Sequence, residues 1–111
     1  MRYFQVIFPG KVFKWIRAKS HEDALEKAIQ KALIFSFFIN LETDLESAIV
    51  VGRNKIKFFQ NGREVTPIDF RNNLSENKNV LFMRLLWQEL QERKPLPKKW
   101  LPFIIFISRY N

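Results

Sequence analysis

The stretch YFQVIFPGKVFKWIR, residues 3–17, decides the fold of this chain. β-branched and aromatic residues fill both halves of it, and Pro9-Gly10 stands between them, which is typical of two strands joined by a tight turn. A two-residue loop there places Phe8 opposite Lys11 and divides the side chains between two faces. Because Pro-Gly favours a type II turn, which twists poorly into a hairpin, a one-residue slip that exchanges the faces stays an alternative. The predicted core face carries Phe4, Val6, Phe8, Phe13 and Trp15.

A helix is predicted directly after this hairpin. Ser20 is a suitable N-cap, and an acidic residue follows three places later at Asp23, as in a capping box. His21, the only histidine of the chain, falls on the first helical position. It is interpreted as a solvent-exposed helix-start residue rather than as a general base. The apolar residues at helical spacing are Leu25, Ala28, Ile29, Ala32 and Leu33.

The rest of the chain predicts further strands and helices. Asn-Gly at 61–62 is the strongest short-range hairpin signal, because both residues tolerate positive φ, and it places Gln60 opposite Arg63. Thr-Pro at 66–67 combines a helix N-cap with a proline at the first helical position. The predicted strands are 48–51, 55–60, 63–66 and 101–108, and the predicted helices are 67–74 and 80–93.

These elements predict a single α+β domain that spans residues 1–111. A mainly antiparallel sheet of about four to six strands is expected, with helices packed on one face of it. Hydrophobic residues make up 47% of the chain and aromatic residues 15%, which is ample for a packed core. The strand at 101–108 is apolar on both faces, so it is expected in the middle of the sheet or paired across a homodimer.

Composition also bears on location. The chain has no cysteine, which excludes disulfides, zinc–thiolate sites and thiol catalysis, fits a reducing compartment and leads us to expect a cytoplasmic protein. No signal peptide is expected, because Gln5 and Lys11 interrupt the first apolar residues. The apolar stretches 32–41 and 101–107 are much shorter than the roughly twenty residues of a membrane-spanning helix. No membrane partner is therefore expected.

The charge of the chain is strongly basic and unevenly distributed. There are 19 Lys+Arg against 11 Asp+Glu, which gives a formal net charge of +8 and a pI near 10.1. Residues 1–21 contain basic residues and no acidic one, whereas residues 22–50 are net acidic. Positive charge therefore gathers on the predicted strands, and an excess of this size favours an acidic partner such as nucleic acid.

Lysine and arginine interleave with aromatic rings in KVFKWIR (11–17) and KIKFF (55–59). A sheet face of this kind neutralises phosphates and stacks bases. The alternative is a solvated strand face whose lysines prevent edge aggregation, with the rings of Phe13 and Trp15 in the core. A second basic patch is expected at 93–99. The predicted nucleic-acid-binding residues are Lys11, Lys14, Arg17, Lys19, Lys55, Lys57, Arg63, Lys98 and Lys99.

No catalytic residue, metal site or cofactor is predicted. Glu42, Asp44 and Glu46 alternate along the chain and could converge on a divalent ion, but a capped turn with solvated carboxylates is the preferred interpretation. The three glycines are isolated from one another, so no phosphate-cradling loop is expected.

The leading hypothesis is a non-enzymatic module that binds DNA or RNA through its basic strands. The competing hypothesis is a protein-interaction module, either an accessory subunit or an inhibitor that docks on a partner protein. The acidic 42–46 segment and the apolar excess fit that class as well. The third hypothesis is a small metal-independent ribonuclease that uses Arg, Lys and Tyr, since such sites leave no spacing signature.

Overall fold

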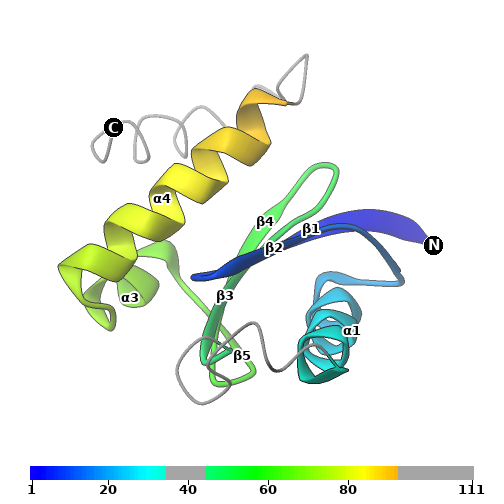
Figure 1. Ribbon diagram of the computed structural model, residues 1–111, viewed down its shortest axis with the longest axis horizontal. Coiled ribbons are helices and arrows are strands. Elements are labelled where there is room, and N and C mark those ends of the chain that lie inside the picture. The colour runs from blue at the N-terminus through cyan, green and yellow to red at the C-terminus, as the bar shows by residue number, and fades with distance from the viewer. Residues whose placement is uncertain (35–44, 93–111) are drawn as a thin grey trace.

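The computed structural model describes residues 1–34 and 45–92. The predicted strand at 101–108 and the basic patch at 93–99, with Lys98 and Lys99, lie outside the described residues, as do Glu42 and Asp44. The elements of the described part are, in order, β1 (Arg2–Phe8), β2 (Lys11–Ala18), α1 (His21–Ile34), β3 (Ser47–Val51), β4 (Ile56–Gln60), β5 (Arg63–Val65), α3 (Pro67–Asn72) and α4 (Glu76–Gln91), as Figure 1 shows.

The strands form one sheet in the order β2-β1-β3-β4-β5, and every pair of neighbours is antiparallel. β1 and β3, which are far apart in sequence, pair with Gln5 opposite Val51 and Ile7 opposite Ile49. This pairing joins the N-terminal hairpin to the meander of β3, β4 and β5. β2 and β5 are the two edges of the sheet. The prediction of an antiparallel α+β domain is confirmed.

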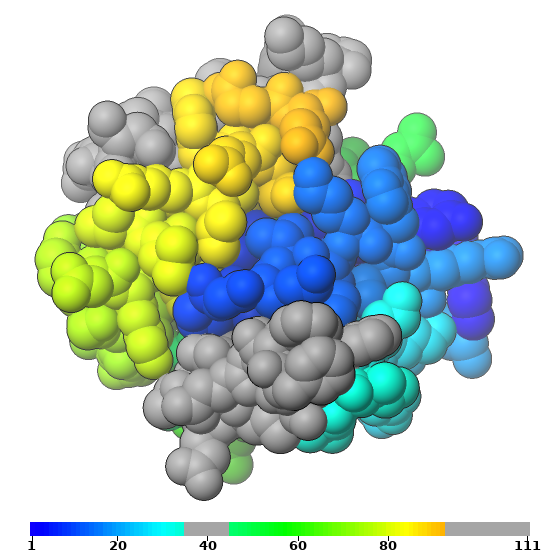
Figure 2. Space-filling view, viewed as in Figure 1, coloured from blue at the N-terminus to red at the C-terminus, as the bar shows by residue number. Residues whose placement is uncertain are grey.

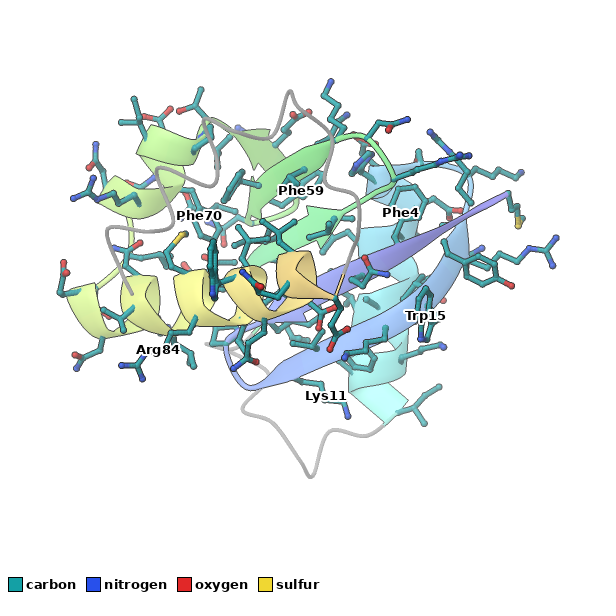
Figure 3. All side chains as sticks on the ribbon, turned by 90° about the horizontal axis from the view of Figure 1, so that it is seen from above. Phe4, Lys11, Trp15, Phe59, Phe70 and Arg84 are labelled. Atoms are coloured by element: carbon teal, nitrogen blue, oxygen red, sulfur yellow. The ribbon has the colours of Figure 1, made fainter. Side chains whose placement is uncertain are left out.

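Helices cover both faces of the sheet rather than one. On one face, Ala24, Leu25 and Ala28 of α1 pack with strand residues that include Phe4 and Phe8. On the other face, the side chains of α3 and α4 pack against a second set of strand residues. Figure 1 shows α1 on one side of the sheet and α4 on the opposite side, and Figure 3 shows Phe4 beside α1.

The cause of this two-sided cover is the composition of the two inner strands. Val6 and Ile7 of β1 are neighbours in sequence, point to opposite faces, and are both fully buried. Ile49 and Val50 of β3 behave in the same way. A strand that is apolar at odd and even positions needs an apolar layer on each side. The two buried clusters therefore stack as helix, sheet and helices.

The N-terminal hairpin begins in the predicted register and then departs from it. Phe8 lies opposite Lys11, as predicted, but the register shifts between Val6 and Phe4, and Phe4 pairs with Ile16. A β-bulge absorbs the extra residue of β2, and Trp15 adopts a φ of 62° within it. The prediction that Trp15 lies on the core face is wrong, because the bulge turns its side chain outward, where it is 67% exposed, and buries Ile16.

The second hairpin follows its sequence signals. Asn61 and Gly62 have φ values of 53° and 79°, and Gln60 lies opposite Arg63, as predicted. The predicted N-cap Thr66 accepts a hydrogen bond from the backbone N–H of Asp69 at the start of α3. These positions are determined by local chemistry, which is why they could be predicted from the sequence.

Helix α4 begins four residues before the predicted start at Val80, at Glu76. Ser75 caps it, with its hydroxyl oxygen accepting from the N–H of Lys78 at 3.3 Å. Asn79, one residue before the predicted start, is 3% exposed and donates to the carbonyl oxygen of Arg71 at 2.9 Å. The Asn79 side chain thus joins α4 to α3 by a hydrogen bond, so the asparagine-rich segment is an ordered part of the fold and not a solvated loop.

Candidate nucleic-acid interface

The predicted basic residues lie on two separate parts of the sheet. Lys11, Lys14 and Arg17 are on the edge strand β2, with Lys19 directly after it. The remaining described ones belong to the β4–β5 hairpin: Lys55 precedes β4, Lys57 is in β4 and Arg63 opens β5. Because β1 and β3 stand between β2 and β4, the structure does not bring the two groups together.

Lys14 is bound to the last turn of α4. Its ammonium Nζ donates to both carboxylate oxygens of Glu92 at 3.0 and 3.1 Å, and it lies 3.5 Å from a carboxylate oxygen of Glu89. These contacts, first of all the hydrogen bond to Glu92, raise the pKa of Lys14 above its ordinary value. Two carboxylates near the C-terminus of a helix oppose its dipole, and Lys14 offsets that unfavourable charge.

Lys57 is bound in a similar way on the opposite face of the sheet. Its Nζ lies 2.9 Å from a carboxylate oxygen of Glu22 in α1 and 3.4 Å from one of Glu64 in β5, and its side chain is only 18% exposed. The hydrogen bond between Lys57 and Glu22 raises the pKa of the lysine and lowers the pKa of the carboxyl group. Lys57 therefore connects three elements of the fold.

We expect Lys57→Met to lower the free energy of unfolding by less than about 1 kcal/mol, with a smaller loss at high salt, as for other partly exposed ion pairs. Lys55→Met is the matched control, because Lys55 is exposed and its ammonium group forms no salt bridge within residues 1–34 and 45–92. Urea unfolding of both variants at two ionic strengths measures the difference. Equal losses of unfolding free energy in the two variants would contradict a stabilising role for the ion pairs of Lys57.

Other cations on β2 and α1 are not held by carboxylates in the way that Lys14 and Lys57 are. Arg17, Lys19 and Lys31 are exposed, and none of them forms a salt bridge with another described residue. Lys27, by contrast, is held in place: its Nζ donates to the carbonyl oxygen of Arg17 at 3.0 Å and lies 3.5 Å from a carboxylate oxygen of Asp23.

Trp15 stands beside these cations. A φ of 62° belongs to the left-handed region, which bulky residues other than glycine rarely adopt and which costs of the order of 1–2 kcal/mol. The ring contacts Tyr3 edge to face, with 6.3 Å between ring centroids and an interplanar angle of 81°. Both rings are more than half exposed, so neither contributes much to the core. An exposed aromatic side chain on a strained backbone marks Trp15 as a candidate functional residue.

A groove lies between Trp15 and the last turns of α1. Its volume is about 360 Å³, and it is an open depression on the surface rather than an enclosed cavity. Trp15, Ile16 and Ile34 supply apolar walls, while Arg17, Lys27, Gln30 and Lys31 supply polar groups. Figure 2 shows the neighbourhood: the blue N-terminal hairpin lies between yellow α4 and the cyan end of α1. We call this the Trp15 groove.

A second hollow of about 320 Å³ lies near the start of α4 and is lined by polar residues such as Gln60 and Asn73. The amide of Asn73 donates to Gln60 at 2.9 Å, and Gln60 donates to the carbonyl oxygen of Phe70 at 3.3 Å. The amide groups of Gln60 and Asn73 are therefore used within the fold, while Glu46 and Lys78 give the lining one acidic and one basic side chain.

His21 is buried, so its interpretation as a solvent-exposed residue is wrong. The side chain is 7% exposed, its Nε2 lies 2.8 Å from the carbonyl oxygen of Lys55, and its ring packs edge to face on Phe4. Burial lowers its pKa below the ordinary value. His21 connects α1, of which it is the first residue, to the segment between β3 and β4, so its role is structural.

Three residues near this groove, Tyr3, Trp15 and Lys31, are absent from the predicted nucleic-acid-binding residues. Tyr3 was given no binding role, and Trp15 was placed on the predicted core face. No local signal announces the bulge that exposes Trp15, because neither glycine nor asparagine occupies that position. Lys31 was given no binding role, and only the packing of α1 beside β2 places it near Trp15.

Among the described residues, no cluster of three or more histidine or acidic side chains could hold a metal ion, and no helix there is long and apolar enough to span a bilayer. Comparison with protein-family models, with curated proteins and with solved structures finds no match for this chain.

Proposed function

We propose that this protein is a non-enzymatic module that binds nucleic acid through the β2 edge surface, defined as Tyr3, Trp15, Arg17, Lys19 and Lys31. The observation that carries the proposal is the exposure of Trp15 on a left-handed backbone beside cations that have no salt bridge in the described part of the chain. A surface of this composition offers both phosphate neutralisation and stacking.

The energetic argument begins with the phosphates. Each phosphate that a lysine or arginine neutralises releases condensed counterions, so the affinity rises with the number of available cations and falls with salt. Lys14 and Lys57 already neutralise carboxylates, so phosphate would have to compete with those partners. Arg17, Lys19 and Lys31 form no salt bridge with another described residue, although the carboxylate of Asp23 lies near Lys19, and the net charge of +8 strengthens the attraction at long range.

A protein-interaction role is the second candidate. Leu33 and Ile34, the last residues of α1, are 52% and 71% exposed, which is unusual for two adjacent large aliphatic side chains. Tryptophan, tyrosine and arginine are also enriched at protein interfaces. This candidate predicts stable capture of one protein partner that survives nuclease treatment.

Binding of labelled single-stranded and double-stranded DNA and RNA at about 50 and about 200 mM salt tests the proposal. The site variant combines Arg17→Glu, Lys19→Glu and Lys31→Glu. The matched variant combines Arg53→Glu, Lys55→Glu and Arg63→Glu, which changes the net charge equally on another part of the sheet.

We expect the site variant to lose at least about tenfold in affinity and to show a flatter salt dependence, since each lost phosphate contact removes about 0.7–0.9 from the slope. The matched variant should keep its affinity within about threefold, as expected when only long-range charge changes. It also tests the prediction that Lys55 and Arg63 contact nucleic acid. Absence of binding by the unmodified protein at the lower salt, or equal losses in the two variants, would overturn the proposal.

A further inference from the structure

We infer that the Trp15 groove holds one unpaired base stacked on the indole ring, so that this protein prefers single-stranded nucleic acid to a duplex. The inference rests on the proposed function and names the class of strand that the β2 edge surface takes.

The backbone holds the indole ring outside the core. Phe4 pairs with Ile16, and Ile16 is 2% exposed, so the position that Trp15 would need in the core is filled. Returning Trp15 to the core would require removal of the bulge and a shift of every later residue of β2 to the other face. The edge-to-face contact with Tyr3 restricts the orientation of the ring. The indole is therefore presented to solvent in a fixed place.

The groove supplies the chemical groups that a nucleotide uses. Trp15 of β2 and Ile34 of α1 both line the groove, so each of the two elements contributes an apolar side chain to it. Arg17 and Lys31 are near enough to line the same hollow and can bind the adjoining phosphates. Gln30 adds an amide, which is able to donate and accept hydrogen bonds at the edge of a base.

Helical spacing explains why α1 contributes these groups together. Gln30 and Lys31 lie three and four residues after Lys27, and Ile34 lies four and three residues after them, which places all four on one side of the helix. Lys27 is fixed by its bonds to the β2 backbone and to Asp23, so this side of α1 is anchored to the strand. The groove is thus formed before a ligand arrives.

The shape of the surface favours an unpaired base. Bases in a duplex are stacked on their neighbours and expose only their edges, whereas a base in a single strand can leave the stack and lie on an aromatic ring. An extended peptide fits less well, because strand addition needs an uninterrupted row of backbone groups and the bulge at Trp15 interrupts the edge of β2.

The test compares Trp15→Gly, Trp15→Phe and the unmodified protein with labelled single strands and duplexes of about 12 nucleotides. Glycine removes the ring and adopts positive φ without strain, so Trp15→Gly should remain folded by circular dichroism and thermal unfolding. We expect Trp15→Gly to lose about tenfold or more in single-strand affinity, and less than about twofold in duplex affinity. Trp15→Phe should keep single-strand affinity within about threefold, since it keeps a stacking ring.

The outcomes separate this inference from the proposed function. Equal affinity for both kinds of strand, or an unchanged single-strand affinity in Trp15→Gly, would overturn the inference, while the triple charge variant would still report on the proposed function. Absence of any nucleic-acid binding would overturn both. Binding of poly-glutamate that depends on Trp15 and displaces the oligonucleotide would assign the groove to an acidic protein segment instead, and would overturn the inference too.

Discussion

Phe70→Ala is expected to lower the free energy of unfolding by about 3–5 kcal/mol, the usual loss for a buried phenylalanine. Phe70 is the fully buried side chain of the short helix α3. Its ring packs edge to face on Phe58 of the sheet and on Phe82 of α4, each with 5.1 Å between ring centroids. Removing the ring therefore opens a cavity where α3, the sheet and α4 meet.

The expected loss comes from packing alone. The backbone N–H of Phe70 donates to the carbonyl oxygen of Thr66 at 2.9 Å, and its own carbonyl oxygen accepts from Gln60, so both hydrogen bonds survive truncation to alanine. Urea unfolding followed by circular dichroism measures the change. Ile68→Ala is the matched control on the same helix, because Ile68 is 66% exposed, and it should change stability by less than about 0.5 kcal/mol. Similar losses of unfolding free energy in the two variants would contradict the conclusion that packing of the Phe70 ring stabilises the core.

The local parts of this fold could be predicted from the sequence. The Asn61-Gly62 turn, the Thr66 cap and the first pairs of the N-terminal hairpin each depend on residues that are neighbours in the chain. Helix α4 shows the limit of that approach. Its asparagine-rich start resembles a loop by composition, whereas in the structure Ser75 caps the helix and Asn79 donates to the preceding carbonyl oxygens of Arg71 and Leu74.

The two-sided cover of the sheet depends on which strands become neighbours. β1 was predicted as one half of a hairpin with a single core face. In the structure it is an inner strand, because β3 pairs with its free edge and Ile7 packs against α4, while Gln5 lies two positions before Ile7. Both residues are therefore buried, although one is polar. Alternation in the sequence gives the faces of a strand but not the number of layers over them.

The candidate site could be predicted only in outline. Lysines on β2 and β4 were assigned alike from composition, yet Lys14 and Lys57 lie against carboxylates from α4 and α1, which are distant in sequence. Trp15 was misplaced because a bulge of one residue exchanges the faces of everything after it. The chemistry of the site was visible in the sequence, and its location depended on tertiary pairing.

His21 is expected to make the stability of this protein depend on pH near neutrality. Burial is the main cause of its lowered pKa, with smaller contributions from the cations of Lys57 and Arg2, whereas Glu22 and the carbonyl oxygen of Lys55 act in the opposite direction. In the unfolded chain the pKa returns to about 6.5. The unfolded chain therefore takes up a proton first as the pH falls, and stability declines below about pH 6.5 toward the lower pKa of the folded state.

The effect of His21 on stability falls in a different pH range from that of Glu22 and Asp23. The pKa values of Glu22 and Asp23 are lowered in the folded protein, so their contribution is lost only below about pH 4.5, where carboxylates of the unfolded chain become protonated. Urea unfolding between about pH 7.5 and pH 5 thus reports mainly on His21. A flat profile of the unmodified protein over that range would contradict the role of its buried imidazole.

His21→Ala is expected to lower the free energy of unfolding at neutral pH by about 2–3 kcal/mol, because it removes a buried ring and its hydrogen bond. The space around that ring is fully used: a Cβ atom at Gly52 would come within 2.8 Å of His21 Nε2 and within 3.1 Å of Phe4. The variant should also lose the decline between about pH 6.5 and pH 5, since no other histidine is present. A variant that loses stability at neutral pH but keeps the decline toward pH 5 would contradict the prediction. The imidazole would then stabilise the fold by packing alone, and the pH dependence of stability would come from the carboxylates.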